Sequence, residues 1–229
     1  MTKLINITTL TGTIKLKSGL HIGGGDASMK IGGIDNEVIK HPITNEPYIP
    51  GSSIKGKVRT LLEWKLGLVG INNGKPVNVT KEYPTDKEKA NALKIAQLFG
   101  NGGDIKDDEE LSKQVGSTRV SFNDCSLVDK IKTEVKFENS INRITSKADN
   151  PRQTERVPSG AKFDFEVSIK VFEDDNNLVE LLKEGLKLLE LDSLGGNGSR
   201  GYGKIKFENL KENGNDIQED FEKIEPFKD

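Results

Sequence analysis

Strict alternation of apolar and polar residues marks two long strands. In LTGTIKLKSGL, Leu10, Gly12, Ile14 and Leu16 share one face, and the threonines and lysines between them occupy the other. KFDFEVSIKVF alternates in the same way, with five apolar residues on one face. Both patterns predict strands with one buried side. TRVSFNDCSLV and KIKFENL predict two further, shorter strands.

Three other segments have apolar residues at helical spacing. The first begins at Ser52 or Ser53, residue types that cap helix N-termini, and repeats apolar residues at i, i+4, i+7 and i+8 from Ile54. The second, TDKEKANALKIAQLF, has Thr85 as its N-cap and Gly100 after its last turn. The third, NLVELLKEGLKLLEL, places four leucines on one side.

The order strand, helix, strand, strand, helix, strand predicts an α+β fold in a single domain over residues 1–229. Its core is a βαββαβ arrangement of the ferredoxin-like or RRM-like type, with one extra helix inserted. We expect the core to comprise residues of about 8–20, 50–70, 117–128 and 160–208. We expect the remainder to form a glycine-rich insertion at 21–50, a helical and polar insertion at 71–116, a basic insertion at 130–159 and an acidic tail at 209–229.

Composition narrows the class of protein. The single cysteine, Cys125, excludes an internal disulfide and is typical of a reducing compartment, so we expect a cytoplasmic protein. There is no run of about 18 apolar residues, so we expect no membrane span. The net charge is −2, but basic residues exceed acidic ones before residue 170, so a nucleic-acid partner is not excluded. The strands lack the aromatic signature on which an ordinary RNA-recognition motif stacks bases.

Two aspartates lie in the glycine-rich segment GLHIGGGDASMKIGGIDNEVIKHP. From the residues alone, Asp26 and Asp35 are either ordinary loop carboxylates or weak candidates for binding magnesium. His21, His41 and Cys125 are too few and too scattered for a structural zinc site. The segment therefore suggests chemistry but does not specify it.

Three basic features could contact phosphates. Lys55 and Arg59 share one helix face beside the predicted N-terminus at Ser52 and Ser53, where the helix dipole favours an anion. The loop LGGNGSRGYG carries Arg200 and allows close backbone approach, but it is also typical of a flexible turn. The basic insertion could follow a nucleic-acid backbone or form a solvated hairpin.

Several motifs, taken in order, resemble a known family. They are GLHIGGGDASMKIGGIDNEVIKHPITNEPYIPGSSIKGKVRTLL, KFENSINRITSKADNPRQTERVPSGAKFDFEV and LGGNGSRGYGKIKF. Together they resemble the backbone RAMP subunit of type III-A CRISPR effector (Csm) complexes. The resemblance extends from about residue 8 to residue 208 and leaves out the acidic tail.

The resemblance implies a function. Copies stack head to tail along a CRISPR guide RNA, beside other Csm subunits and away from any membrane. The insertion at 21–50 acts as a lid, and that at 130–159 as a thumb that wedges into the guide–target duplex. Each copy cuts the single-stranded target RNA with a divalent metal, expected to be Mg²⁺. The aspartate of the family's G-x-I-D motif corresponds to Asp35, the expected catalytic residue and metal ligand, and Asp26 receives no role.

The resemblance also implies which residues bind RNA. They are His21, Ser52, Ser53, Lys55, Arg59, Asn142, Arg143, Arg152, Gly195, Gly196, Gly198 and Arg200. Two alternatives remain open: a guide-RNA scaffold that does not cut, and a guide-processing nuclease. The second relies on histidine acid–base chemistry, for which only His21 and His41 are present.

Overall fold

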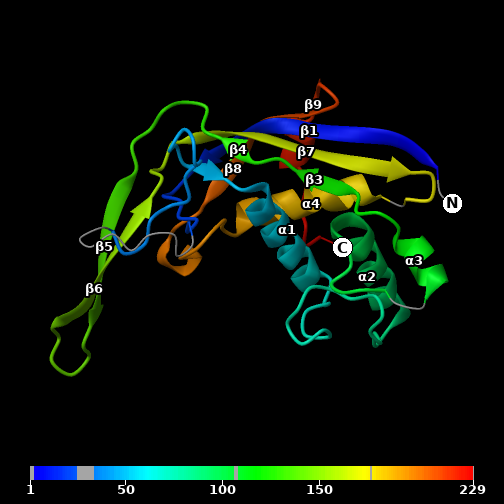
Figure 1. Cartoon of the computed structure of the whole chain (residues 1–229), viewed down its shortest axis with the longest axis horizontal. Coiled ribbons are helices and arrows are strands. Elements are labelled where there is room, and N and C mark those ends of the chain that lie inside the picture. Colours follow the sequence, from blue (N-terminus) through cyan, green and yellow to red (C-terminus); the bar gives the residue numbers. More distant parts are fainter. Residues whose placement is uncertain (1–2, 25–33, 106–107, 176, 229) are drawn as a thin grey trace.

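An antiparallel sheet with strand order β3-β7-β1-β8-β9 organises the chain (Figure 1). The computed structural model describes residues 3–24, 34–105, 108–175 and 177–228. The strands of this sheet are β1 (Leu4–Leu16), β3 (Val120–Phe122), β7 (Lys162–Phe172), β8 (Ile205–Glu212) and β9 (Asn215–Asp216). The predicted alternation is confirmed, because Leu10, Ile14 and Leu16 are buried and the threonines between them are partly exposed.

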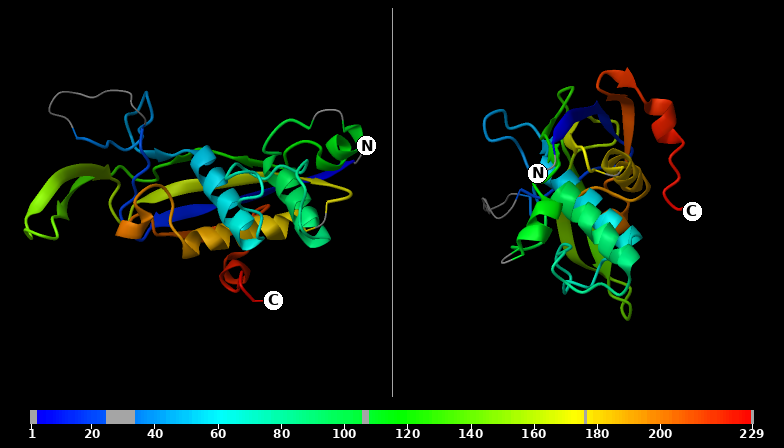
Figure 2. Two further views of the ribbon diagram at one scale, coloured as in Figure 1. Left: turned by 90° about the horizontal axis from the view of Figure 1, so that it is seen from below. Right: turned by 90° about the vertical axis from the view of Figure 1, so that its right-hand side faces the viewer.

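Helices cover one face of this sheet (Figures 1 and 2). They are α1 (Gly51–Lys65), α2 (Asp86–Phe99) and α4 (Leu178–Leu191). The apolar stripes expected for α1 and α4 are buried against the strands. Aromatic residues of the strands complete the core, and the rings of Phe165 and Phe207 lie 4.9 Å apart between centroids. The core thus forms between the sheet and these helices, as the sequence predicts.

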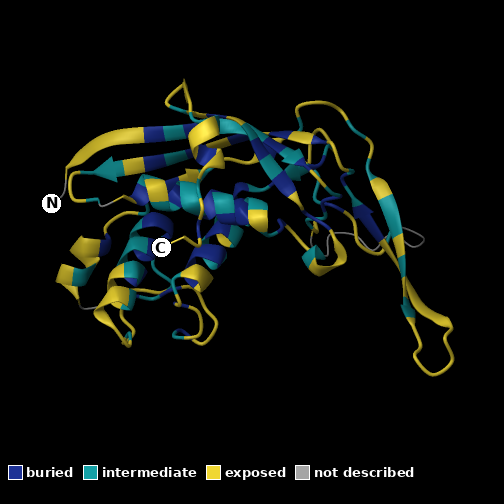
Figure 3. Cartoon of the chain, turned by 180° about the vertical axis from the view of Figure 1, so that it is seen from behind, coloured by how far each residue is buried: buried dark blue, intermediate teal, exposed yellow. Residues whose placement is uncertain are grey.

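A two-stranded hairpin projects from one end of the sheet (Figures 1 and 3). It consists of β5 (Glu134–Ile141) and β6 (Ala148–Arg156). Most of it is exposed, and burial begins at its root with Thr154 and Glu155. A short pair, β2 (Tyr48–Ile49) with β4 (Cys125–Ser126), lies beside the N-terminus of α1. The basic insertion is therefore a hairpin, and its contact with a nucleic-acid backbone stays a prediction.

The start of α1 differs from the prediction. Neither Ser52 nor Ser53 is the N-cap; the helix begins at Gly51, and Pro50 precedes it without a side-chain cap. The Asp124 carboxylate instead accepts a hydrogen bond of 2.7 Å from the Gly51 N–H. A cap supplied from another loop leaves no local sequence signal, which explains the error.

Two polar segments contain short helices that the sequence pattern did not predict. The polar stretch after Gly100 contains α3 (Glu109–Val115), which Asp108 caps by accepting a hydrogen bond from the Leu111 N–H. The acidic tail contains α5 (Gln218–Glu222), and its Phe221 is buried against Phe207. Each helix is too short to show a clear apolar period, so the sequence pattern did not predict it.

Across the described ranges, none of the helices has the length and apolar character needed to cross a membrane.

Candidate functional site

The loop that carries Asp35 lies against the hairpin strand β6. Asp35 is exposed, and its Oδ2 accepts a hydrogen bond of 3.1 Å from the backbone N–H of Gln153. Asn36 forms a parallel bridge with Thr154, and its carbonyl accepts from the Glu155 N–H at 2.9 Å. The loop therefore pairs with one edge of β6 over a few residues. This pairing determines where the Asp35 carboxylate lies.

A buried carboxylate, Glu155, fixes the following part of the same loop. Its Oε2 accepts from the Val38 N–H at 3.0 Å, and its Oε1 accepts from Lys40 Nζ at 2.8 Å. Thr133 Oγ1, just before β5, also donates to Oε1. Burial alone would raise the pKa of Glu155, but the hydrogen bonds from Lys40, Thr133 and Val38 outweigh it and hold the pKa below its ordinary value.

His21 connects β6 to the glycine loop at residues 194–203. Its Nδ1 donates a hydrogen bond of 2.7 Å to the Glu155 carbonyl, and its own carbonyl accepts from the Gly196 N–H at 2.9 Å. At Gly195, where φ is +75°, an added Cβ would lie 2.4 Å from the His21 carbonyl oxygen. Glycine is required there by both its conformation and the close approach of the two segments. The structure thus brings His21, Gly195 and Gly196 together as one unit.

The rest of the glycine loop packs against the hairpin root. A Cβ at Gly198 would meet Ser193 Oγ at 2.2 Å, so the Ser193 side chain would have to shift to admit it. The buried ring of Tyr202 lies beneath two cations, with Lys136 Nζ 4.6 Å and Arg156 Cζ 5.1 Å from its centroid. These cation–π contacts join the loop to both hairpin strands.

A polar hollow of about 350 Å³ separates the hairpin from the tip of the glycine loop. Arg152 and Arg200 line it together with Glu138, Asn139 and Ser140. The Arg200 guanidinium lies 3.8 Å from the Glu138 carboxylate, and Arg152 donates to Ser140 Oγ at 3.3 Å. The structure therefore brings two of the four predicted RNA-binding arginines, Arg152 and Arg200, to one cavity.

At the hairpin tip, the two predicted residues have different surroundings. The Asn142 carboxamide accepts hydrogen bonds of 3.0 Å from the N–H groups of Ile144 and Thr145, so it shapes the turn. Arg143 beside it is exposed. Both residues lie at the tip of the hairpin, whereas the Asp35 loop pairs with β6 near its root.

On α1, Lys55 and Arg59 also differ from each other. Arg59 donates to Glu63 at 2.6 Å and to the Val77 carbonyl at 3.2 Å, so its guanidinium is used inside the protein. Lys55 forms no ion pair with any residue in the described part of the chain. Burial, and secondarily the charge of Arg59, lower the pKa of Lys55. A half-buried cation in this state gains from an incoming anion.

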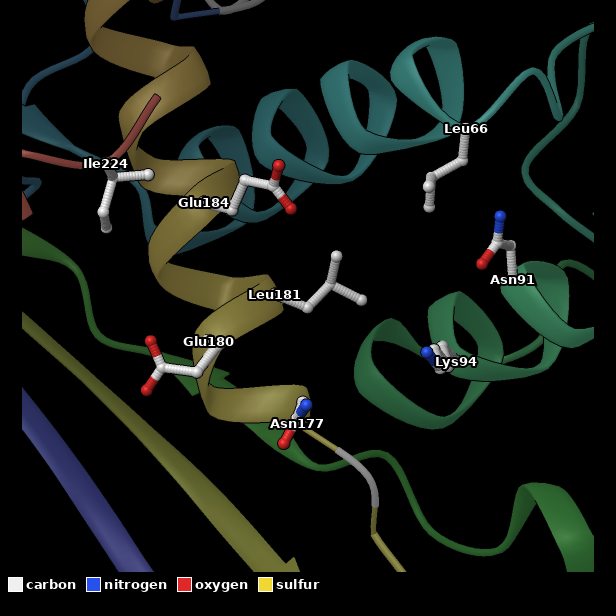
Figure 4. A pocket seen from close by; sticks show the side chains of 8 residues that line it. All are labelled: Leu66, Asn91, Lys94, Asn177, Glu180, Leu181, Glu184 and Ile224. Atoms are coloured by element: carbon white, nitrogen blue, oxygen red, sulfur yellow. The ribbon is translucent and has the colours of Figure 1, made fainter. Parts of the chain in front are cut away.

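A second hollow, of about 400 Å³, lies far from Asp35 among α1, α2 and α4 (Figure 4). Leu66, Leu181 and Ile224 form its apolar part, and amides and charged side chains surround them. Within residues 3–24, 34–105, 108–175 and 177–228, no group of three or more His, Cys, Asp and Glu side chains could hold a metal ion. Asp26 lies outside the described residues.

The sequence patterns did not indicate the residues that hold Asp35 in place. Gln153, Glu155 and Lys40 act across more than a hundred positions of sequence, because the loop pairs with a strand that follows much later. The signal that could have indicated Glu155 is its position as an acidic residue in the otherwise basic stretch NPRQTERV. Acidic residues are almost never fully buried unless they are paired, and Glu155 is both buried and paired.

Comparisons with known proteins show to which family the chain belongs. Residues 13–206 match the model of the RAMP superfamily. The chain is 45% identical over 211 residues to the CRISPR system Cms endoribonuclease Csm3 of Streptococcus thermophilus, with 86% of each chain covered. It is 40% identical over 225 residues to the protein of the same name from Methanothermobacter thermautotrophicus, covering 88% of this chain and 84% of that one.

A solved structure is similar as well. It is the crystal structure of a Csm3-Csm4 subcomplex in the type III-A CRISPR-Cas interference complex. The similarity has a TM-score of 0.54 and 31% identity, and it covers 92% of this chain and 80% of the other.

Proposed function

This chain belongs to the RAMP superfamily, and we propose that it is the guide-RNA-binding backbone subunit of a type III-A CRISPR effector complex that cuts complementary target RNA. The observation that carries the proposal is the placement of Asp35. Its exposed carboxylate is bonded to β6 of the projecting hairpin. Similarity at 45% identity to a protein named as an endoribonuclease supports the same activity.

The proposed chemistry needs one correctly placed negative charge. The target's 2′-oxygen attacks the adjacent phosphorus and the bond to the 5′-oxygen breaks. The departing 5′-oxygen takes a proton from water, so the products are a 2′,3′-cyclic phosphate and a 5′-hydroxyl. The attack requires a deprotonated hydroxyl in line with the leaving oxygen. We propose that the hairpin displaces a base beside Asp35, because an unstacked nucleotide reaches this geometry more easily. Asp35 then accepts the 2′-OH proton or binds the metal, and both roles need it ionised.

A divalent cation, Mg²⁺ in this proposal, fits Asp35 only with help from the RNA. One carboxylate does not form a protein cage, and the described residues offer no larger group of ligands. Mg²⁺ commonly binds through one or two carboxylates, with waters and substrate phosphates completing its shell. When bound, it would supply positive charge to the scissile phosphate.

We propose that the guide backbone is bound both by α1 and by the polar hollow beside the hairpin. Lys55 on α1 offers a cation without an ion pair among the described residues, and Arg152 and Arg200 line the polar hollow. Ser52, Ser53 and Arg143 remain proposed contacts, whereas Arg59 is committed to Glu63. Contacts of this kind recognise phosphates, so specificity comes from base pairing.

Two further parts of the proposal concern architecture. We propose that β1, α1, β3, β7, α4 and β8 correspond to a ferredoxin-like core, and the strand order β3-β7-β1-β8 supports this. We also propose that copies assemble head to tail along the guide, as the family resemblance implies. Repetition of one interface would place Asp35 carboxylates at regular intervals along the target.

The alternative of a guide-processing nuclease has little support. His21 donates through Nδ1 to the Glu155 carbonyl, and His41 Nδ1 accepts from the N–H groups of Ile43 and Thr44 at 3.3 and 3.4 Å. Both histidines thus have structural partners. The scaffold alternative differs from the proposal only in whether target RNA is cut.

The deciding experiment uses complexes reconstituted with wild-type chain or with Asp35→Ala. Complementary RNA and Mg²⁺ are added, and the fragments are resolved by length. We expect wild type to cut at regular spacing, and Asp35→Ala to bind target within about twofold of wild type and to leave it uncut. Cutting by Asp35→Ala at the same positions would refute the role of Asp35, and an inert wild-type complex would favour the scaffold.

A further inference from the structure

We infer that Glu155 is a positioning residue, which holds the Asp35 loop against the hairpin so that the cleaving carboxylate and the hairpin keep one geometry. The inference rests on the proposed function, because positioning matters only if Asp35 acts on RNA. Nothing in the sequence resemblance gives Glu155 a role. Four contacts, distributed along residues 35–40, point to this role.

Those contacts tie residues 35–40 to β6 from end to end. The Asp35 carboxylate accepts from the Gln153 N–H, and the Asn36 carbonyl accepts from the Glu155 N–H. Val38 and Lys40 use the Glu155 side chain. The hydrogen bond between Asp35 and Gln153 is exposed and open to competition from water, whereas the Glu155 carboxylate is only 3% exposed. The buried end is therefore the anchor of the loop.

The position of Glu155 makes the anchor specific to the hairpin. Its carboxylate also accepts from Thr133, immediately before β5, and its carbonyl accepts from His21. One residue thus touches the root of both hairpin strands, the Asp35 loop and the segment that contacts the glycine loop. A hairpin that displaces a base would consequently carry Asp35 with it, and the cut would stay at a fixed distance from the displaced base.

Removal of this carboxylate should release the loop without removing any group that touches RNA. Glu155→Ala leaves the Val38 N–H and the Lys40 ammonium without their partner, and the Asp35 carboxylate then samples several positions. A misplacement of about 1 Å can reduce a rate by about a hundredfold. We expect the single-turnover cutting rate at saturating target to fall at least about tenfold, with target affinity within about twofold of wild type.

A double variant separates positioning from simple loss of charge. In Glu155→Gln, the new amide N–H₂ faces the Lys40 ammonium. In Lys40→Met with Glu155→Gln, that conflict is gone, and the Gln oxygen can accept from Val38 while its N–H₂ donates to Thr133. We expect each single variant to cut slowly and the double variant to recover to within about threefold of wild type.

Asp175, just after the C-terminal end of β7, provides a matched control. Its carboxylate forms an ion pair of 3.0 Å with Arg119, and both side chains are only 4% exposed. Neither residue belongs to the proposed site. Asp175→Asn should lower the melting temperature while the cutting rate per assembled complex stays unchanged. It shows whether lost stability alone slows cutting.

The experiment compares these complexes by cutting rate, fragment lengths and amide hydrogen exchange at residues 38 and 153. Slow cutting, faster exchange at both amides and recovery in the double variant are expected. Glu155→Ala that cuts at the wild-type rate, or a double variant as slow as Glu155→Ala, overturns the inference. So does slowing of Asp175→Asn to the same extent. Failure of the proposed function looks different, because wild type itself is then inert or Asp35→Ala still cuts.

Discussion

The backbone N–H of Gln153 donates a hydrogen bond of 3.1 Å to Oδ2 of Asp35, across 118 positions of sequence. A loop aspartate that appears unconstrained in the sequence is thereby placed by a strand of the projecting hairpin. Its neighbour Asn36 pairs with the same strand, and Glu155 anchors the residues that follow. The proposed cutting group and the proposed wedge are parts of one local structure.

Lys55 and Arg59 should behave differently when they are replaced. Lys55→Met should weaken guide binding and reduce the slope of log affinity against log salt by about 0.7, the value for one phosphate contact on a single strand. The folding stability of the Lys55→Met variant should change little, because Lys55 has no ion pair among the described residues. The measurement is guide affinity at several salt concentrations.

Arg59→Met is the matched comparison for Lys55→Met. It leaves the Glu63 carboxylate, only 9% exposed, without its cation. We expect a loss of about 2 kcal/mol of folding free energy, below the range for a fully buried pair. A reduced salt slope for Arg59→Met, with an unchanged melting temperature, would contradict this division of roles.

Gly195→Ala should damage the contact between the glycine loop and His21. The added Cβ would meet the His21 carbonyl at 2.4 Å, in addition to the cost of a positive φ. Gly201→Ala is the control, because its φ is +82° but nothing lies within 4 Å of the added Cβ. The control should lose about 1 kcal/mol from the backbone alone. Gly195→Ala should lose more in urea unfolding, and equal losses would argue against the packing role.

The Glu155 anchor should weaken in acid. Its folded-state pKa lies below the ordinary value, so its ionised form stabilises the fold above the unfolded pKa of about 4.3 and the benefit is lost as pH falls through the folded pKa. The Lys40 ammonium contacts the Glu155 carboxylate directly, and the His21 ring contacts only the Glu155 carbonyl. Urea unfolding of wild type and Glu155→Gln should therefore show a stability difference that shrinks below about pH 4.3. A constant difference down to pH 3 would contradict the assignment.

Gly56→Ala should stabilise the chain. Gly56 is an exposed residue inside α1, and an added Cβ has nothing within 4 Å. Alanine is favoured over glycine by about 1 kcal/mol in a helix interior. For a domain of this size, the melting temperature should rise by about 2–4 °C. A fall would mean that α1 needs glycine for a close contact absent from the isolated chain.

The main framework could be predicted because its signals are local. Alternation in KFDFEVSIKVF and helical spacing in NLVELLKEGLKLLEL identify a strand and a helix, and both have their expected faces buried. Thr85 was predicted as a cap and accepts a hydrogen bond from the Glu88 N–H. In each case, the information lies within one or two turns of the residues concerned.

The site could not be predicted to the same depth, because its contacts are distant in sequence. The Asp124 cap of α1 and the Glu155 anchor come from segments far along the chain. The motif resemblance selected Asp35 but did not reveal what holds it. Arg59 shows the opposite limit: its spacing from Lys55 suggested a shared phosphate site, whereas its position beside Glu63 gives it an internal partner.

The central claim is that target cleavage requires the negative charge of Asp35. Asp35→Asn tests it most directly, because the Asn oxygen can still accept from the Gln153 N–H while the charge is lost. The measurement is the single-turnover cutting rate of complementary RNA by the reconstituted complex with Mg²⁺, at equal target occupancy. The account predicts a fall of about a hundredfold or more. A rate within a few-fold of wild type would contradict it.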